Sequence, residues 1–304
     1  MDNKKVVILM STYNGEKYII EQLDSLINQT YKNIEILIRD DGSKDSTVKI
    51  LMEYSKNYSN VNVVNGANIG FINSFFELLK IADNNADYYA YCDQDDVWME
   101  DKIERAVKFL DKTEPSKPVL YFSNSDYYDS EMNFIKTAEK NKKYNFRNSL
   151  VECVTQGMTM VINKAAKELI IENQPQNCLY HDWWTYMICS GLGKVIYDKK
   201  SLVKYRRHNK SVTVEGKNFF QLLIWRIKNF LLGDSLKQIK KQWYEYKSFF
   251  YDRLKEDDKK IINLLARPKY NFFIALKKTF YPKRFRRKIM DEINLRVLFL
   301  IGKL

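Results

Sequence analysis

Three aspartates within four residues form the cluster in this chain best suited to chemistry. Asp93, Asp95 and Asp96 follow an apolar run, residues 88–92, that has the length of a buried strand. Carboxylates this close repel one another, and burying them without partners is costly. The cluster is therefore either a solvated loop tip or a binding site for a hard divalent cation, which takes carboxylates together with the phosphates of a substrate.

Similar polar loops follow three earlier strand-length runs, at residues 6–10, 34–38 and 61–64. Each loop precedes a segment with helical periodicity, and this alternation is typical of a mostly parallel sheet with right-handed crossovers and helices on both faces. The loops then meet at the carboxyl edge of the sheet, where open α/β sheets bind ligands. The segments expected to converge are 12–14, 40–41, 68–70 and 93–96.

The pattern changes after residue 119. Further short strands are predicted at residues 119–123, 158–162, 195–197 and 202–205, with a polar loop or small hairpin at 131–148. A helix is expected at 181–190, with Asp182 in its first turn, where the helix dipole favours a carboxylate. Amphipathic helices are expected around 219–232 and 272–280, so we predict a domain at 1–216 and a helical extension at 217–304.

Charge divides the chain in the same way. The 304 residues carry a net charge of +12, but residues 217–304 contribute +14 and residues 1–216 contribute −2. A basic segment of this kind suits either an anionic membrane face or nucleic acid. Basic side chains alternate with Phe, Trp and Leu on the expected helices, which favours a peripheral contact with an anionic membrane.

Composition limits the remaining classes. The four cysteines lack a C-x-x-C pair, which fits reduced thiols in the cytosol, and the N-terminal run is too short for a signal peptide. No apolar run approaches the roughly 20 residues of a membrane span. We therefore expect a cytoplasmic protein held peripherally at the inner face of the cell membrane.

Taken together, the motifs resemble the family 2 glycosyltransferases, which use the GT-A fold. Residues 11–16 (STYNGE), 40–47 (DDGSKDST) and 93–96 (DQDD) match, in order, that family's opening loop, second-strand loop and D-x-D motif. The resemblance covers roughly the first two-thirds of the chain. It implies a Rossmann-like, mostly parallel twisted sheet with helices on both faces, followed here by a basic helical extension.

A narrower resemblance concerns the sugar. Residues 92–98 (CDQDDVW), 156–161 (QGMTMV) and 181–184 (HDWW) are similar to bacterial rhamnosyltransferases of polysaccharide or lipopolysaccharide synthesis. Where many such relatives have Asn-x-Gly or Gly-Cys-Thr, this chain has Gln156, Gly157 and Met158. The resemblance implies transfer of L-rhamnose from dTDP-L-rhamnose to a glycan or lipid-linked glycan, with a UDP-hexose donor as the alternative.

The resemblance assigns a role to each matching position. Asp182 would be the general base, and Gly157, Trp183 and Trp184 would contact the acceptor. Asp93, Asp95 and His208 would hold Mn²⁺ or Mg²⁺. The donor would be bound by Thr12, Asn14, Glu16, Asp40, Asp41, Asn68, Asp93 and Arg206.

These residue types suit a displacement with inversion. A departing nucleoside diphosphate leaves charge on a phosphate oxygen, and a divalent cation stabilises that charge without a proton. The acceptor hydroxyl must lose its proton as it attacks, and a carboxylate within hydrogen-bond reach can accept it.

Each assignment has a structural alternative. Asp40, Asp41 and Asn68 could simply form turns, and Asp182 could simply begin a helix. The Trp183–Trp184 pair could belong to the core, and Arg206 and His208 could lie on a solvated surface.

Two other classes of protein also compete. A sugar nucleotidyltransferase should carry a glycine-rich loop after its first strand, and residues 11–15 are not one. A nucleic-acid-binding protein would use the basic tail, but no recognised binding motif accompanies the charge, so no nucleic-acid partner is expected.

Overall fold

The computed structural model describes residues 4–139, 144–208 and 235–304, which form two compact units. Unit 1 comprises Met1–Asn141, Thr155–Gln174 and Gly193–His208, and unit 2 comprises Lys142–Val154, Pro175–Leu192 and Asn209–Leu304. Two segments from within the predicted 1–216 domain therefore group with the C-terminal helices. The helix expected at 219–232 lies outside the described residues.

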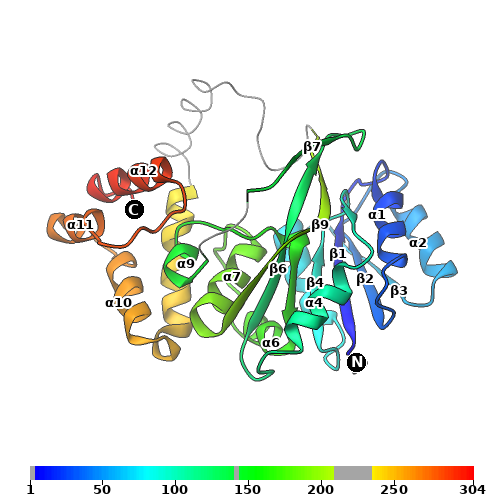
Figure 1. The fold of residues 1–304 in the computed structure, drawn as a ribbon, viewed down its shortest axis with the longest axis horizontal. Helices are drawn as coiled ribbons and strands as arrows, with labels where there is room; N and C mark the ends of the chain where they lie inside the picture. The colour runs from blue at the N-terminus through cyan, green and yellow to red at the C-terminus, as the bar shows by residue number, and fades with distance from the viewer. Residues whose placement is uncertain (1–3, 140–143, 209–234) are drawn as a thin grey trace. The chain divides into compact units, whose positions relative to one another are not determined.

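Unit 1 begins with the predicted alternation of strands and helices (Figure 1). Four strands end close to the predicted positions, and three helices connect them. These elements are β1 (Val6–Thr12), α1 (Ile19–Ile27), β2 (Ile34–Asp40), α2 (Thr47–Asn57), β3 (Val61–Asn65), α3 (Phe71–Ile81) and β4 (Tyr88–Cys92). All residues of β4 and the first five of β1 are buried, as expected for strands covered on both faces.

The second half of unit 1 extends this sheet with mixed pairing. Its elements are β5 (Val97–Trp98), α4 (Lys102–Leu110), β6 (Val119–Tyr128), β7 (Phe134–Thr137), the 3₁₀ turn η1 (Gly157–Thr159), β8 (Met160–Asn163), α6 (Lys164–Glu172) and β9 (Lys194–Arg206). The described strands form one sheet in the order β3-β2-β1-β4-β8-β6-β9-β5, with β7 beside β6. The first four strands are parallel, whereas β8 is antiparallel to both β4 and β6.

Two predicted strands are a single strand in the structure. The polar residues 198–200 suggested a break, but β9 runs through them and pairs with β6 across a register shift. Asp198 is buried there because it accepts hydrogen bonds from the Arg105 guanidinium at 2.9 Å and the Tyr121 hydroxyl at 3.0 Å. Partners distant in sequence therefore make the polar stretch compatible with a strand.

Unit 2 is helical. It contains α5 (Phe146–Ser149), α7 (His181–Leu192), α9 (Ser235–Phe250), η2 (Tyr251–Arg253), α10 (Glu256–Leu265), α11 (Phe272–Thr279) and α12 (Ile289–Leu300). The helices predicted near 181–190 and 272–280 are confirmed as α7 and α11. Within the described residues, no helix is both long enough and apolar enough to cross a membrane.

A lysine in the core of unit 1 gives a test of this packing. Lys102 opens α4 and is fully buried, with its Nζ atom 3.4 Å from the centre of the Trp98 ring. Within the described residues this ammonium makes no hydrogen bond. Burial lowers the pKa of Lys102 to about 7, although the aromatic ring favours the charged form.

We expect Lys102→Met to stabilise the protein by ~1–3 kcal/mol at pH 7, because a well-packed apolar side chain avoids the cost of burying a charge. The unfolded chain binds this proton below pH ~10.4, whereas the folded protein binds it only below about 7. The wild type therefore loses stability as the pH falls across that interval, and the gain from the substitution should be small at pH 10. Urea unfolding at both pH values measures the difference.

The matched control is Lys108→Met on the same helix, where the side chain is half exposed and the expected change is within ~0.5 kcal/mol at either pH. A loss of stability in Lys102→Met at pH 7 would show that the contact with Trp98 outweighs the cost of burial.

Candidate active site

The loops after β1, β2 and β4 come together because these strands are parallel and adjacent. Met10 of β1 lies between Ile38 of β2 and Cys92 of β4, and Thr12 lies opposite Asp40. The polar segments that follow these strands therefore share one edge of the sheet, as the sequence predicted. The resulting site is made from unit 1 residues that are widely separated in the chain.

Asp40 has no acceptor position left for a ligand. One carboxylate oxygen accepts the amides of Gly42 and Ser43 at 3.1 and 2.8 Å, and the other accepts the hydroxyls of Thr12 and Ser43 at 3.0 and 2.5 Å. A carboxylate has about four lone-pair positions, and all are occupied here. Asp40 therefore fixes the turn after β2, and Thr12 contributes to the same network instead of projecting toward a ligand.

Asp41 is buried too, but it keeps one acceptor position. Oδ1 accepts the Arg39 guanidinium and the Ile69 amide, and Oδ2 accepts the Gly70 amide at 2.9 Å. Arg39 also donates to the Ala67 carbonyl at 2.9 Å, so this ion pair fastens the loop that contains Asn68 to the end of β2. The remaining lone pair of Oδ2 is the one place where this carboxylate can receive a further N–H or O–H donor.

Asn14 and Glu16 link the opening loop to the loop after β2. The Asn14 side-chain carbonyl accepts the Lys44 amide at 2.8 Å, and the Glu16 carboxylate accepts the Ser46 amide at 2.8 Å. Both side chains are exposed, and Asn14 has a φ of 48°, a left-handed conformation that Asn tolerates. These residues hold two neighbouring loops in place at the edge of the site.

Gln94, between the two aspartates of the D-x-D motif, connects that motif to the opening loop. Its Oε1 accepts the Tyr13 amide at 2.8 Å, and its Nε2 donates to the Tyr13 carbonyl at 3.1 Å. Gly15 makes this possible, because a Cβ atom there would come within 2.4 Å of Oε1. One side chain thus joins two loops that are far apart in the sequence.

The aspartates of the motif differ in environment. Asp95 is partly exposed, and its Oδ2 lies 2.8 Å from Nε2 of His208, whose ring stacks on Tyr18. Asp93 is half-buried on the same loop. Asp96 is fully buried and accepts the Arg206 amide at 3.0 Å, and burial, followed by repulsion from Asp95 and Asp93, raises its pKa well above the usual range. Asp95 and His208 are therefore brought together at this edge of the sheet, while Asp96 anchors the end of β9.

The buried Arg206 side chain holds the loop that carries Asp95. Its guanidinium is 2% exposed and donates to the Asp95 carbonyl at 2.9 Å, the Ser130 carbonyl at 2.9 Å and the Glu21 carboxylate at 2.6 Å. It also lies 4.5 Å from the centre of the Tyr18 ring. These contacts assign Arg206 to positioning the D-x-D loop, and its burial leaves no surface for a phosphate contact.

The remaining predicted residues belong to other elements of the chain. Gly157 is buried in η1 of unit 1, beside β4. In unit 2, the Oδ1 atom of Asp182 accepts the Trp183 amide at 2.7 Å in the first turn of α7. Trp183 is 8% exposed, and its indole donates to the Ser149 carbonyl. Trp184 is fully buried against Tyr246, which makes it core packing and does not support the acceptor contact predicted for it.

A family model describes more than half of this sequence. Residues 7–170 match the model of "Glycosyl transferase family 2". The chain belongs to glycosyltransferase family 2. It is therefore an enzyme that transfers a sugar, and the fold and family predicted from the motifs are confirmed.

Individual relatives agree with this assignment. The chain is 29% identical to the dTDP-rhamnosyl transferase RfbG of Shigella flexneri, over 96% of this chain and 99% of the relative. It is also 27% identical to an uncharacterized glycosyltransferase of Rickettsia typhi, over 68% of this chain and 65% of that one.

Two solved structures share the fold. The first is Staphylococcus aureus TarS, residues 1–349, in complex with UDP-GlcNAc, with a TM-score of 0.54 at 17% identity over 98% of this chain and 92% of that one. The second is the mannosyltransferase PcManGT of Pyrobaculum calidifontis, in complex with GDP-Man and Mn²⁺, with a TM-score of 0.56 at 14% identity over 98% and 74%.

The residues at the carboxyl edge fit the divalent cation used by many members of the family. Two neighbouring ligands of one small octahedral cation lie about 3 Å apart, since each bond is ~2.1 Å, and Asp95 and His208 are 2.8 Å apart. Within the described residues no group of three or more His, Cys, Asp or Glu side chains forms a complete metal site. A cation bound here would take its other ligands from water and from the donor's phosphates.

Sequence reasoning missed three residues that organise the glycosyltransferase site: Gln94, Arg39 and Glu21. Arg39 carried a detectable signal, because a charged residue at the end of an apolar strand needs a partner, and Asp41 lies two positions away. Gln94 and Glu21 carried none, since their partners Tyr13 and Arg206 are distant in sequence.

The contact of Gln94 with Gly15 can be tested by a double-mutant cycle. We expect Gln94→Ala and Gly15→Ala each to lower stability by ~1 kcal/mol, because either one removes the amide pair with Tyr13. Gly15→Ala should cost much less in the Gln94→Ala background, where there is no side-chain amide to displace. Urea unfolding of the four proteins gives the coupling.

The two single variants should also weaken nucleotide-sugar binding to a similar extent, measured by calorimetry. Additive stability losses, with no coupling between positions 15 and 94, would contradict this account of the motif.

Proposed function

We propose that this glycosyltransferase moves L-rhamnose from dTDP-L-rhamnose to a hydroxyl of a glycan or lipid-linked glycan, with inversion and with Mn²⁺ or Mg²⁺ bound. The observation that carries the proposal is the Asp95–His208 pair, in which Asp95 lies after β4 on a loop that Gln94 joins to the loop after β1. The choice of donor is supported by the Shigella flexneri dTDP-rhamnosyl transferase, which aligns over nearly the full length of both chains. UDP-hexose donors are the alternative, because the TarS structure contains UDP-GlcNAc.

Different residues have different roles in donor binding. Asp95, His208 and Asp93 hold the cation, which when bound stabilises the charge on the departing diphosphate. Asp41 offers its remaining Oδ2 lone pair to a base or ribose donor. Gln94, Asp40 and Arg206 keep the surrounding loops in one conformation, so that little ordering is needed when the donor binds.

We propose Asp182 as the general base. Its place in the first turn of α7 favours the ionised carboxylate, because the N-terminal end of a helix stabilises negative charge. An ionised carboxylate can accept the proton of the acceptor hydroxyl as it attacks the anomeric carbon. Attack from the side opposite the departing diphosphate inverts the configuration.

A lipid-linked acceptor would place the enzyme at the inner face of the cell membrane. The support is the net charge of +14 on residues 217–304, since juxtamembrane cations are attracted to anionic lipid. Peripheral binding to such a membrane is part of the proposal.

Donor identity and metal dependence can be tested together by thermal shift. We expect dTDP-L-rhamnose with Mn²⁺ to stabilise the protein by ~2–3 kcal/mol at about a hundred times its Kd, because the ligand binds only the folded state. UDP-glucose, UDP-GlcNAc and GDP-mannose should shift the melting temperature less. Asp95→Asn should lose the part of the shift that needs Mn²⁺, whereas Glu100→Gln, an exposed acid after the same motif, should keep it.

Stabilisation by another donor would replace the sugar assignment while leaving the reaction class intact. If none of these nucleotide sugars stabilises the protein with or without the metal, the proposed reaction is wrong.

The role of Asp182 is tested by separating binding from turnover. Asp182→Asn should lower kcat by ~10²-fold or more while donor binding is unchanged, because only proton transfer is lost. The matched control is Asp252→Asn, an exposed acid of unit 2, which should keep wild-type kcat. Initial rates at saturating donor, with calorimetric donor binding, measure both quantities. A kcat close to that of the wild type would remove Asp182 from the mechanism.

A further inference from the structure

Helix α12 is apolar on two opposite faces, although only one of them is buried. Leu295, Leu298 and Phe299 are buried inside unit 2. Residues on the opposite side form a stripe at helical spacing, and they are between 39% and 65% exposed: Ile289, Met290, Ile293, Val297, Leu300 and Ile301. Among the described residues nothing buries this stripe, and a contiguous exposed apolar face usually marks an interaction surface.

The neighbouring helix α11 carries a second exposed apolar stripe. Phe272, Phe273 and Phe280 are 54%, 73% and 74% exposed, and their spacing places them on one side of the helix. Helix α11 packs on α12, and Arg296 of α12 donates to the Thr279 carbonyl of α11. Exposed aromatic and aliphatic side chains on two adjacent helices exceed the scattered apolar residues of an ordinary surface.

This apolar surface lies within the most basic part of the chain. Residues 267–304 contain eleven Lys and Arg residues and only two acidic residues, Asp291 and Glu292. Glu292 accepts the amides of Phe285 and Arg286 and pairs with Arg296 of the same segment. The segment still keeps a net charge of +9.

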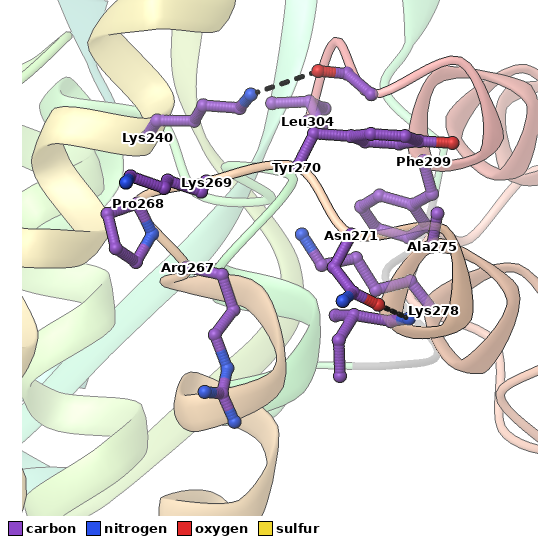
Figure 2. A pocket seen from close by; sticks show the side chains of 12 residues that line it. Lys240, Arg267, Pro268, Lys269, Tyr270, Asn271, Ala275, Lys278, Phe299 and Leu304 are labelled. Carbon is purple, nitrogen blue, oxygen red and sulfur yellow. Dashed lines mark hydrogen bonds between the residues drawn. The ribbon is translucent and has the colours of Figure 1, made fainter.

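A pocket beside α11 concentrates this charge (Figure 2). Four cationic side chains line it, namely Lys240, Arg267, Lys269 and Lys278. No Asp or Glu side chain of the described residues lines the pocket. The space open to water-sized groups is about 40 Å³, which at ~10–15 Å³ per water holds about three such groups, enough for the unesterified oxygens of a lipid phosphate.

Two of these cations disfavour the protonated form of Lys278. Lys278 is buried, and its Nζ donates to the Leu265 carbonyl at 3.2 Å. Burial, together with repulsion from Lys240 and Arg267, lowers the pKa of Lys278 to about 8. An anion in the pocket would relieve this repulsion, because an opposite charge favours the protonated lysine.

We propose that α11, α12 and this cationic pocket, which we call the lipid-binding face, bind an anionic membrane. The exposed stripes enter the interface between headgroups and acyl chains, and the pocket holds the phosphate of a lipid headgroup. This inference rests on the proposed function in one respect, because a lipid-linked acceptor requires the enzyme to work at a membrane.

Charge complementarity and the apolar stripes together favour a membrane over other partners. An anionic membrane offers phosphates next to hydrocarbon, which matches a basic pocket next to exposed Phe and Ile side chains. Nucleic acid offers phosphates but would leave the apolar stripe of α12 in water. A second copy of this chain would bring another strongly basic surface against the first, and like charges repel.

The test is co-sedimentation of the full-length protein with phosphatidylcholine vesicles containing about 30% phosphatidylglycerol, compared with phosphatidylcholine alone. The wild type should bind the anionic vesicles about tenfold more tightly or better. Phe273→Asp combined with Ile293→Asp should weaken binding by about tenfold or more, because two apolar side chains no longer enter the interface. Arg267→Ala combined with Lys269→Ala should weaken it by a similar factor.

Matched controls distinguish a specific role of the lipid-binding face from general effects of changed charge or a disturbed fold. Phe134→Asp in unit 1, where the side chain is 58% exposed, and Lys56→Ala combined with Lys199→Ala should bind like the wild type. Melting temperatures of all variants verify the fold. Asp95→Asn should also bind vesicles normally, so failure of the proposed reaction and failure of this inference give different results.

Three results would overturn the proposal. The first is equal binding to neutral and anionic vesicles. The second is wild-type binding by either face variant. The third is a wild type that does not bind vesicles and that light scattering shows to be a dimer, together with a monomeric Phe273→Asp and Ile293→Asp double variant.

Discussion

Hydrogen bonds from side chains to the backbone of neighbouring loops hold together the loops at the carboxyl edge of the sheet. The loops after β1, β2 and β4 have little regular structure of their own, so strand pairing alone does not fix them. Asp40 accepts the amides of its own turn, and Asp41 accepts amides of the loop before α3. Gln94 bonds to both the amide and the carbonyl of Tyr13. Removing one partner from such a network leaves its buried polar groups unpaired, which costs more than the hydrogen bond itself contributes.

Two buried arginines of unit 1 connect elements that are distant in the sequence. Arg39 and Arg206 are buried with their guanidinium groups on protein acceptors, and each connects elements that the chain brings together only on folding. Such pairs add little net stability, because desolvation offsets most of the attraction, but breaking one is costly. Their value here is geometric, since they fix the loops around Asp95 and His208, whose side chains are partly exposed.

Unit 2 combines a dense aromatic core with an unusual surface. Trp184, Trp243 and Tyr246 are fully buried, and the Trp243 indole donates to the Leu150 carbonyl. Segments 142–154 and 175–192 complete this core, although both lie between strands of unit 1 in the sequence. The helix that carries Asp182 is therefore built on the same core as the C-terminal helices, so the proposed base and the proposed membrane-binding surface belong to one folding unit.

The amino-acid sequence was sufficient to predict the alternation of strands and helices, the family, and the positions of Asp40, Asp41, Asp93 and Asp95 at or just after the ends of strands. These features depend on local apolar periods and on loops that parallel pairing must bring to one edge. Only the tertiary structure decided which aspartates retain acceptor capacity, that Arg206 and Trp184 are buried, and that Gln94 joins two loops. Those outcomes depend on partners that are far away in the chain, and no local pattern encodes the partner of a single polar side chain.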